Sequence, residues 1–325
     1  MVWHKAGALA LGWMLVACGD PSTRADPVLG SGPMGGGTDA GDVDDATTGD
    51  DADPDDGTAG ADDASATTTA EPPTTGDDGT TDGPATGDDA GSTGQPPPAG
   101  LDHVGTLVVL GDSISDGGGQ APYYYDLLRA DLAAHYGQIE YVNRAQSGSM
   151  TGALDSQIDG LPNSLPGPVA VVITSGGNDM KDDIVPVVTG FDGPLIAQMS
   201  ANIDVALGML LQPGRFGPGV EVYVFEGNIY DASDGVGDFG ANDCNFGSGL
   251  PAIPTDAIFM RWNDGIRDAV LARGQVAVDM HAYFYGHGYH ANPNWYASDC
   301  THPSATGHDE LHRLFYEQIT GESLP

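Results

Sequence analysis

Basic side chains are scarce in this sequence. The 325 residues include 10 Lys and Arg against 47 Asp and Glu, which gives a formal net charge of −37 at pH 7. Nineteen of the acids precede residue 101, so the rest of the chain carries 28 acids against eight Lys and Arg. Binding to nucleic acid or to an anionic lipid surface depends on clustered basic side chains. The composition therefore argues against nucleic acid as a partner and against membrane attachment through a basic patch.

Long apolar runs are scarce too. Residues 1–18 have a basic start at His4 and Lys5 and then about a dozen mostly apolar residues. This run is too short for an ordinary membrane-spanning helix and is typical of an export signal. Its end, Leu15 to Cys18 (LVAC), is similar to the lipobox of bacterial lipoproteins. We expect export to the outer membrane or cell surface, with lipid on Cys18 as the only membrane attachment; a plain signal peptide is the alternative.

Residues 19–100 have almost no large apolar side chains. They consist mainly of Asp, Gly, Thr, Ala and Pro, with imperfect repeats such as TTGDDGTTDGPATGDDAG. Such a segment cannot bury enough apolar surface to offset the entropy cost of ordering, so we expect a disordered acidic linker. A calcium-binding array is the alternative, because DADPDDG loosely resembles a Ca²⁺ loop. The bidentate Glu and the regular spacing of an EF-hand are missing.

Predicted strands and helices alternate in residues 101–325, a normal length for one globular domain. Alternation of this kind implies right-handed crossovers and a parallel sheet covered on both faces. We therefore predict an α/β fold, a three-layer α/β/α sandwich with about five parallel strands. The predicted elements are strand 106–110, helix 122–136, strand 139–142, strand 168–175, helix 196–211, strand 220–225, helix 255–273, strand 275–279 and helix 303–319.

Four short motifs follow predicted strands or precede the last predicted helix. They are Gly111-Asp112-Ser113, Asn143 to Gly148 (NRAQSG), Gly176 to Asp179 (GGND) and Asp299 to Pro303 (DCTHP). Together, and in this order, they resemble the SGNH or GDSL family of hydrolases. The resemblance covers essentially the whole domain. It implies a flavodoxin-like strand order and ester hydrolysis that needs no metal and no organic cofactor.

Ser113 and His302 are the candidate pair for nucleophilic catalysis. A hydroxyl becomes a good nucleophile when a positioned imidazole takes its proton, and a third group must fix the imidazole tautomer. Asp299, three residues before His302, can reach the other ring nitrogen. The resemblance implies that the oxyanion donors are the backbone N–H groups of Ser113 and Gly148 and the side-chain amide of Asn178. For each of these residues alone, a purely structural role is the alternative. Taken together, the residues favour a catalytic role.

The predicted function is ester hydrolysis by a monomeric serine esterase through an acyl-serine intermediate. The family includes lipid esterases, lysophospholipases, thioesterases and carbohydrate deacetylases, so the fold does not select the substrate. Segments 230–254 and 283–296 contain Tyr, Phe, Trp, Asn and Asp but no long aliphatic run. This composition favours a short acyl group on a small polar molecule or a carbohydrate. A displayed binding module without turnover is the non-enzymatic alternative.

Cysteine is scarce, with three residues in the chain. If Cys18 carries lipid, Cys244 and Cys300 remain, and an even pair in an oxidising compartment is expected to form a disulfide. Cys300 lies between Asp299 and His302, so the bridge would anchor the catalytic loop. Two buried free thiols are the alternative.

Histidines are clustered at His281, His287 and His290, which makes a metal site conceivable. No carboxylate or cysteine lies at a recognisable ligand spacing beside them. We therefore predict no metal and assign these residues to an aromatic-rich loop near the active site. His308 and His312 are interpreted as ordinary residues of the last helix.

Overall fold

A computed structural model describes residues 100–241, 244 and 251–324 of the chain. The predicted export signal with Cys18, and the predicted linker up to residue 99, lie outside the described residues. Within the described ranges, no helix combines the length and the apolar character needed to cross a bilayer.

The described strands form a parallel sheet in the order β2-β1-β3-β4-β5. This is the predicted flavodoxin-like order. All residues of the neighbouring strands β1 and β3 are buried, because helices cover both faces of a parallel sheet. The strands are β1 (Thr106–Gly111), β2 (Glu140–Asn143), β3 (Val169–Thr174), β4 (Val222–Gly227) and β5 (Val276–Val278).

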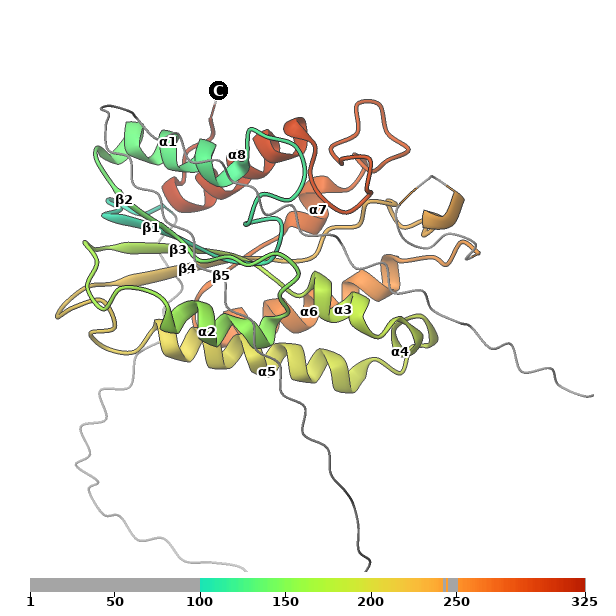
Figure 1. Ribbon diagram of the computed structural model, residues 1–325, viewed down its shortest axis with the longest axis horizontal. Helices are drawn as coiled ribbons and strands as arrows, with labels where there is room; N and C mark the ends of the chain where they lie inside the picture. Colours follow the sequence, from blue (N-terminus) through green and yellow to red (C-terminus); the bar gives the residue numbers. More distant parts are fainter. Residues whose placement is uncertain (1–99, 242–243, 245–250, 325) are drawn as a thin grey trace, which may run out of the picture. The chain divides into compact units, whose positions relative to one another are not determined.

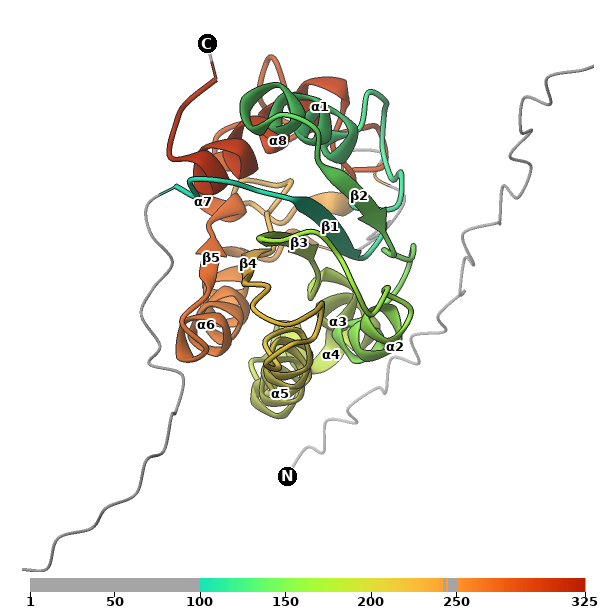
Figure 2. The same ribbon diagram turned by 90° about the vertical axis from the view of Figure 1, so that its left-hand side faces the viewer.

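Helices cover the two faces of the sheet, as Figures 1 and 2 show. Leu107 and Val109 of β1 belong to the hydrophobic cluster that includes α1 and α8, whereas Val108 and Leu110 belong to the cluster of α2, α5 and α6. The predicted three layers are therefore confirmed. One face carries α1 (Tyr124–Tyr136), α7 (Met280–Phe284) and α8 (Ala305–Thr320). The other carries α2 (Leu154–Asp159), α3 (Gly177–Asp182), α4 (Ile184–Thr189), α5 (Gly193–Leu210) and α6 (Asp256–Ala272).

Each predicted strand and long helix is present, with ends that differ by a few residues. Helix α5 begins at Gly193, three residues before the predicted start, because Pro194 occupies its first turn, where proline needs no hydrogen-bond donor. The sequence analysis missed α2, α3, α4 and α7. Each has only five or six residues, too few to establish a helical period.

The carboxyl ends of β1, β2 and β3 lie at one edge of the sheet. The chain passes from β1 to β2 on one side and returns to β3 on the other, so β1 and β3 flank the point where the strand order reverses. Ligands of open α/β sheets bind outside the carboxyl ends of strands at such a point. The first two predicted motifs begin at the last residues of β1 and β2, and the third begins two residues after β3.

Candidate active site

Ser113, His302 and Asp299 form one hydrogen-bonded chain. The Nε2 atom of His302 lies 2.7 Å from the Oγ atom of Ser113, and its Nδ1 atom lies 2.6 Å from the Oδ2 atom of Asp299. Ser113 follows β1, whereas the other two residues lie in the loop before α8. The fold thus brings together residues 189 positions apart in the sequence.

Asp299 is held as an ionised acceptor. Its Oδ1 atom accepts hydrogen bonds from the backbone N–H groups of Thr301 and His302, both at 3.0 Å. Partial burial raises the pKa of this carboxyl group, but the hydrogen bonds from His302 and Thr301 outweigh burial and lower the pKa to about 2. A carboxylate at Nδ1 keeps the proton on that nitrogen. Nε2 is then free to accept the proton of the Ser113 hydroxyl group.

Gly118 makes room for the imidazole. Its N–H donates to the carbonyl of Ser113 at 2.6 Å. A Cβ atom on Gly118 would lie 2.4 Å from Cδ2 and 2.7 Å from Nε2 of His302. Any side chain here would therefore displace the ring from Ser113. The sequence analysis did not count Gly118 as a site residue, although the run of glycines at 117–119 was a signal.

Two of the predicted oxyanion donors, Ser113 and Gly148, lie in the loops after β1 and β2, and the third, Asn178, lies in the first turn of α3, which follows β3. In the described part of the chain, the backbone N–H groups of Ser113 and Gly148 donate to no acceptor. The Asn178 amide donates one N–H to the Ser149 carbonyl at 2.9 Å, and an amide nitrogen carries a second N–H. Gly148 has φ +78° and open space at its Cβ position, so its left-handed conformation is what requires glycine.

A buried chain of hydroxyl groups supports the turn that carries Ser113. Ser115 Oγ lies 2.6 Å from the Tyr124 hydroxyl and 2.7 Å from Thr174 Oγ1. Thr174 in turn donates to Asp112 at 3.2 Å, and Asp112 also accepts the Ile114 N–H at 3.0 Å. Burial raises the pKa of Asp112 to about 6. Asp112 therefore stabilises the turn that carries Ser113.

His308 clamps the same turn from α8. Its Nδ1 atom accepts the backbone N–H of Tyr124 at 3.4 Å, so its Nε2 atom is the donor to the Gly118 carbonyl, 2.9 Å away. Burial lowers the pKa of His308 to about 4, which keeps the ring neutral. The interpretation of His308 as an ordinary helix residue missed this role, because its partners lie more than 180 positions away.

Cys244 and Cys300 form the predicted disulfide, with a Cα–Cα distance of 5.4 Å. Cys300 has φ +56°, a left-handed conformation that is uncommon outside glycine. The next residue is also anchored, because the Tyr230 hydroxyl group donates to the Thr301 carbonyl at 2.9 Å. The loop of Asp299 and His302 is therefore tied at adjacent positions to segments far away in the sequence.

The clustered histidines have separate surroundings. His281 stacks on Phe259 and His287 stacks on Trp295 at a centroid distance of 3.6 Å. His290 lies 3.0 Å from a carboxylate oxygen. Among the described residues, no group of three or more His, Cys, Asp and Glu side chains is arranged to hold a metal ion.

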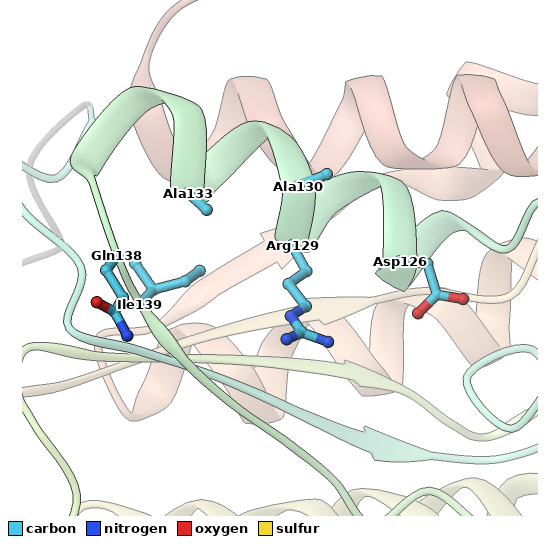
Figure 3. A pocket seen from close by; sticks show the side chains of 6 residues that line it. All are labelled: Asp126, Arg129, Ala130, Ala133, Gln138 and Ile139. Carbon is cyan, nitrogen blue, oxygen red and sulfur yellow. The ribbon is translucent and has the colours of Figure 1, made fainter. Parts of the chain in front are cut away.

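A hollow beside α1 shares no residue with this site (Figure 3). The Arg129 guanidinium group in it lies 4.9 Å from the centroid of the Tyr141 ring, a cation–π distance. The hollow is lined by Asp126, Arg129, Ala130, Ala133, Gln138 and Ile139.

A seryl hydroxyl, an imidazole and a carboxylate linked at the carboxyl edge of a parallel sheet are the parts of a serine acylhydrolase site. A family model described as GDSL-like lipase/acylhydrolase matches residues 109–310. The chain belongs to this family of ester hydrolases.

Solved structures similar to the chain include lipases and an esterase. A phospholipase A1 from Streptomyces albidoflavus NA297 has 22% identity and a TM-score of 0.43, over 66% of this chain and 100% of that one. An extracellular lipase from Streptomyces rimosus has 20% identity and a TM-score of 0.44, over 66% and 99%. An acetylxylan esterase from Geobacillus stearothermophilus has 18% identity and a TM-score of 0.45, over 68% and 95%. No curated protein matches the chain.

Proposed function

We propose that the protein hydrolyses carboxylic esters through an acyl intermediate on Ser113. The observation that carries this proposal is the hydrogen-bonded chain from Ser113 through His302 to Asp299. Its orientation suits proton transfer from the hydroxyl group to Nε2, because the ionised carboxylate holds the other ring proton on Nδ1.

In the acylation step, Ser113 Oγ attacks the ester carbonyl carbon while His302 Nε2 takes the hydroxyl proton. The carbonyl π bond breaks and its electrons move to oxygen, where the N–H groups of Ser113 and Gly148 and the Asn178 amide stabilise the negative charge. The tetrahedral intermediate then collapses. The bond to the alcohol oxygen breaks, and the imidazolium gives its proton to the leaving alcohol.

Deacylation repeats the same steps with water as the nucleophile. His302 takes a proton from water as the oxygen attacks the acyl carbon. The second tetrahedral intermediate expels Ser113 Oγ, which takes its proton back from Nε2. The products are a carboxylic acid and an alcohol.

Ser113→Ala tests the proposal. The variant should fold normally and lose turnover of p-nitrophenyl acetate, and it should no longer react with a fluorophosphonate probe. Ser156→Ala is the matched control, because Ser156 is exposed on α2 and, within the described residues, its hydroxyl group donates to the nearby Ala153 carbonyl and to no other group. Full activity in the Ser113 variant would refute the proposal. A folded wild-type protein that neither turns over esters nor reacts with the probe would favour a binding module.

The proposed substrate carries a short acyl group on a small polar molecule or a carbohydrate. Two groups that contact Ser113, Gly118 and His302, are small or polar. Segments 230–254 and 283–296 contain no long aliphatic run that could line a site for a long acyl chain. We expect the rate to fall steeply along p-nitrophenyl esters from acetyl to octanoyl. A rate optimum at eight carbons or longer would instead identify a lipid esterase.

We also propose that the enzyme is an exported lipoprotein held at the outer membrane or cell surface through Cys18. The support is the apolar run that ends in LVAC. Labelled palmitate fed to expressing cells should enter the wild-type chain and not the Cys18→Ala variant. Equal labelling of the two would contradict lipidation at this residue.

A further inference from the structure

The side chain of Gln157 on α2 pairs with the backbone at the end of β1. Its Oε1 atom accepts the N–H of Gly111 at 2.8 Å, and its Nε2 atom donates to the Gly111 carbonyl at 2.9 Å. Because one partner is a donor and the other an acceptor, the orientation of the amide is fixed. Gln157 is buried, and Gly111 lies two residues before Ser113.

The same amide reaches the loop of Gly148. Gln157 Nε2 lies 3.2 Å from the Oγ atom of Ser149, and this hydroxyl group donates to the Gly111 carbonyl at 2.9 Å. Gln157, Ser149 and Gly111 thus form a closed group of hydrogen bonds. It joins the end of β1 to the residue that follows Gly148.

Ser149 also connects to the third oxyanion donor. Its carbonyl accepts the Asn178 amide at 2.9 Å, so the position of Ser149 fixes one N–H of that amide. The second N–H then has a set direction. Gly148 precedes Ser149 in the chain, and Asn178 bonds to the Ser149 carbonyl, so both donors are joined through Ser149 to Gln157 and to the end of β1. The residue before Gly148 has a separate anchor, because the Ser147 N–H donates to Asp116 at 2.9 Å.

We propose that Gln157 is a positioning residue that sets the geometry of Gly148 and Asn178 as oxyanion donors. This inference rests on the proposed function. Gln157 acts through Ser149 and touches neither the substrate nor the hydrogen-bonded chain of His302 and Asp299. Its loss should slow formation of the tetrahedral intermediate and leave substrate binding nearly unchanged.

Gln157→Glu and Gln157→Leu test the inference. The Glu side chain keeps the size and the acceptor of glutamine, but it has one donor when protonated and none when ionised, so it cannot donate to both the Gly111 carbonyl and Ser149. The Leu side chain has neither group. Gln212→Glu is the matched control, because Gln212 is exposed beyond the carboxyl end of α5. Melting temperatures identify folded variants, and the Glu variant remains informative if the Leu variant does not fold.

We expect kcat for p-nitrophenyl acetate to fall about 10- to 100-fold in the folded Gln157 variants, with KM within about twofold. This is less than the 10²–10³ that removal of a whole oxyanion donor costs, because the donors are displaced and not lost. Affinity for a boronic acid that mimics the tetrahedral intermediate should fall by the same factor as kcat/KM. The proton NMR signal of the His302–Asp299 hydrogen bond should persist.

The inference is overturned if folded Gln157 variants keep kcat within twofold of the wild-type value. It is equally overturned if kcat falls while boronic acid affinity is unchanged, or if the His302–Asp299 signal is lost. The Ser113→Ala result separates this failure from failure of the proposed function. Inactive Ser113→Ala beside fully active Gln157 variants would refute only the role of Gln157.

Discussion

The two sides of Ser113 are held by different kinds of bond. On the side of Asp299 and His302, a disulfide, a tyrosyl hydrogen bond and the start of α8 fix one short loop. On the side of the oxyanion donors, the supports are hydrogen bonds that buried or half-buried polar side chains make. Gln157 donates to the Gly111 carbonyl, and Asp179 accepts from Thr151.

The difference follows from what each side must hold in place. The proposed roles of Asp299 and His302 depend on side chains of a loop that is partly exposed, so the loop needs anchors of its own. Two of the proposed oxyanion donors are backbone N–H groups, and backbone is positioned by the hydrogen bonds of its neighbours. A variant on one side should therefore leave the other side intact.

Asp299→Asn should have the largest effect. An amide at this position can donate to Nδ1, which favours the tautomer with the proton on Nε2, facing Ser113, so the hydroxyl group loses its base. We expect kcat for p-nitrophenyl acetate to fall by about 10⁴. This is the loss of kcat that follows when the triad aspartate of a serine protease is changed to asparagine. Asp264→Asn on the exposed face of α6 is the control. A loss below tenfold would contradict the assigned role of Asp299.

Asn178→Ala should come next, with kcat reduced by about 10²–10³ through loss of one oxyanion donor. The proton NMR signal of the His302–Asp299 hydrogen bond should remain in this variant and should be altered in Asp299→Asn. Loss of the signal in Asn178→Ala would show that the two sides are not independent.

The sequence located the candidate site residues better than their supports. Ser113, Gly148, Asn178, Asp299 and His302 lie in short motifs beside predicted strands and helices, and hydrophobic periodicity placed those elements correctly. The supports carry no local pattern. Gln157 lies on a six-residue helix that shows no period, and it meets Gly111 across 46 positions.

Such contacts depend on how the layers pack. Asp179 illustrates this, since its local sequence does not indicate its partner. Its carboxylate accepts the N–H and the hydroxyl group of Thr151, across 28 positions. A polar side chain with a distant partner looks the same in sequence as one on a solvated surface.

Cys244→Ser removes the covalent support of the Asp299 and His302 side. The bridge spans 56 positions, and closing a loop of this length is worth about 4 kcal/mol in the chain-entropy account. We expect a lower melting temperature and a severalfold lower kcat measured well below it, because Cys300 lies within the catalytic loop. The Cys244→Ser/Cys300→Ser variant excludes effects of a free thiol. Unchanged kcat in both would limit the disulfide to stability.

The smallest effect on catalysis should come from Glu226→Gln. Glu226 lies in β4, on the side of the oxyanion donors. Glu226 is fully buried, and its Oε1 atom accepts the Ser175 hydroxyl group at 2.9 Å. Within the described residues its Oε2 atom has no hydrogen-bond partner. Burial raises the pKa of this carboxyl group from 4.5 to about 8, so the folded protein keeps a proton that the unfolded chain releases.

A raised carboxyl pKa lowers stability as pH increases. Between about pH 4.5 and pH 8 only the folded state binds this proton, so Glu226 should reduce the free energy of unfolding by about 1.4 kcal/mol per pH unit. Glu226→Gln keeps a neutral group of the same shape and removes this dependence. Urea unfolding from pH 5 to pH 9 should show the variant gaining stability over the wild type up to about pH 8, with kcat at pH 7 within twofold. Parallel stability profiles of wild type and variant would mean that Glu226 is ionised in the folded protein. The Oε2 atom would then require a hydrogen-bond donor.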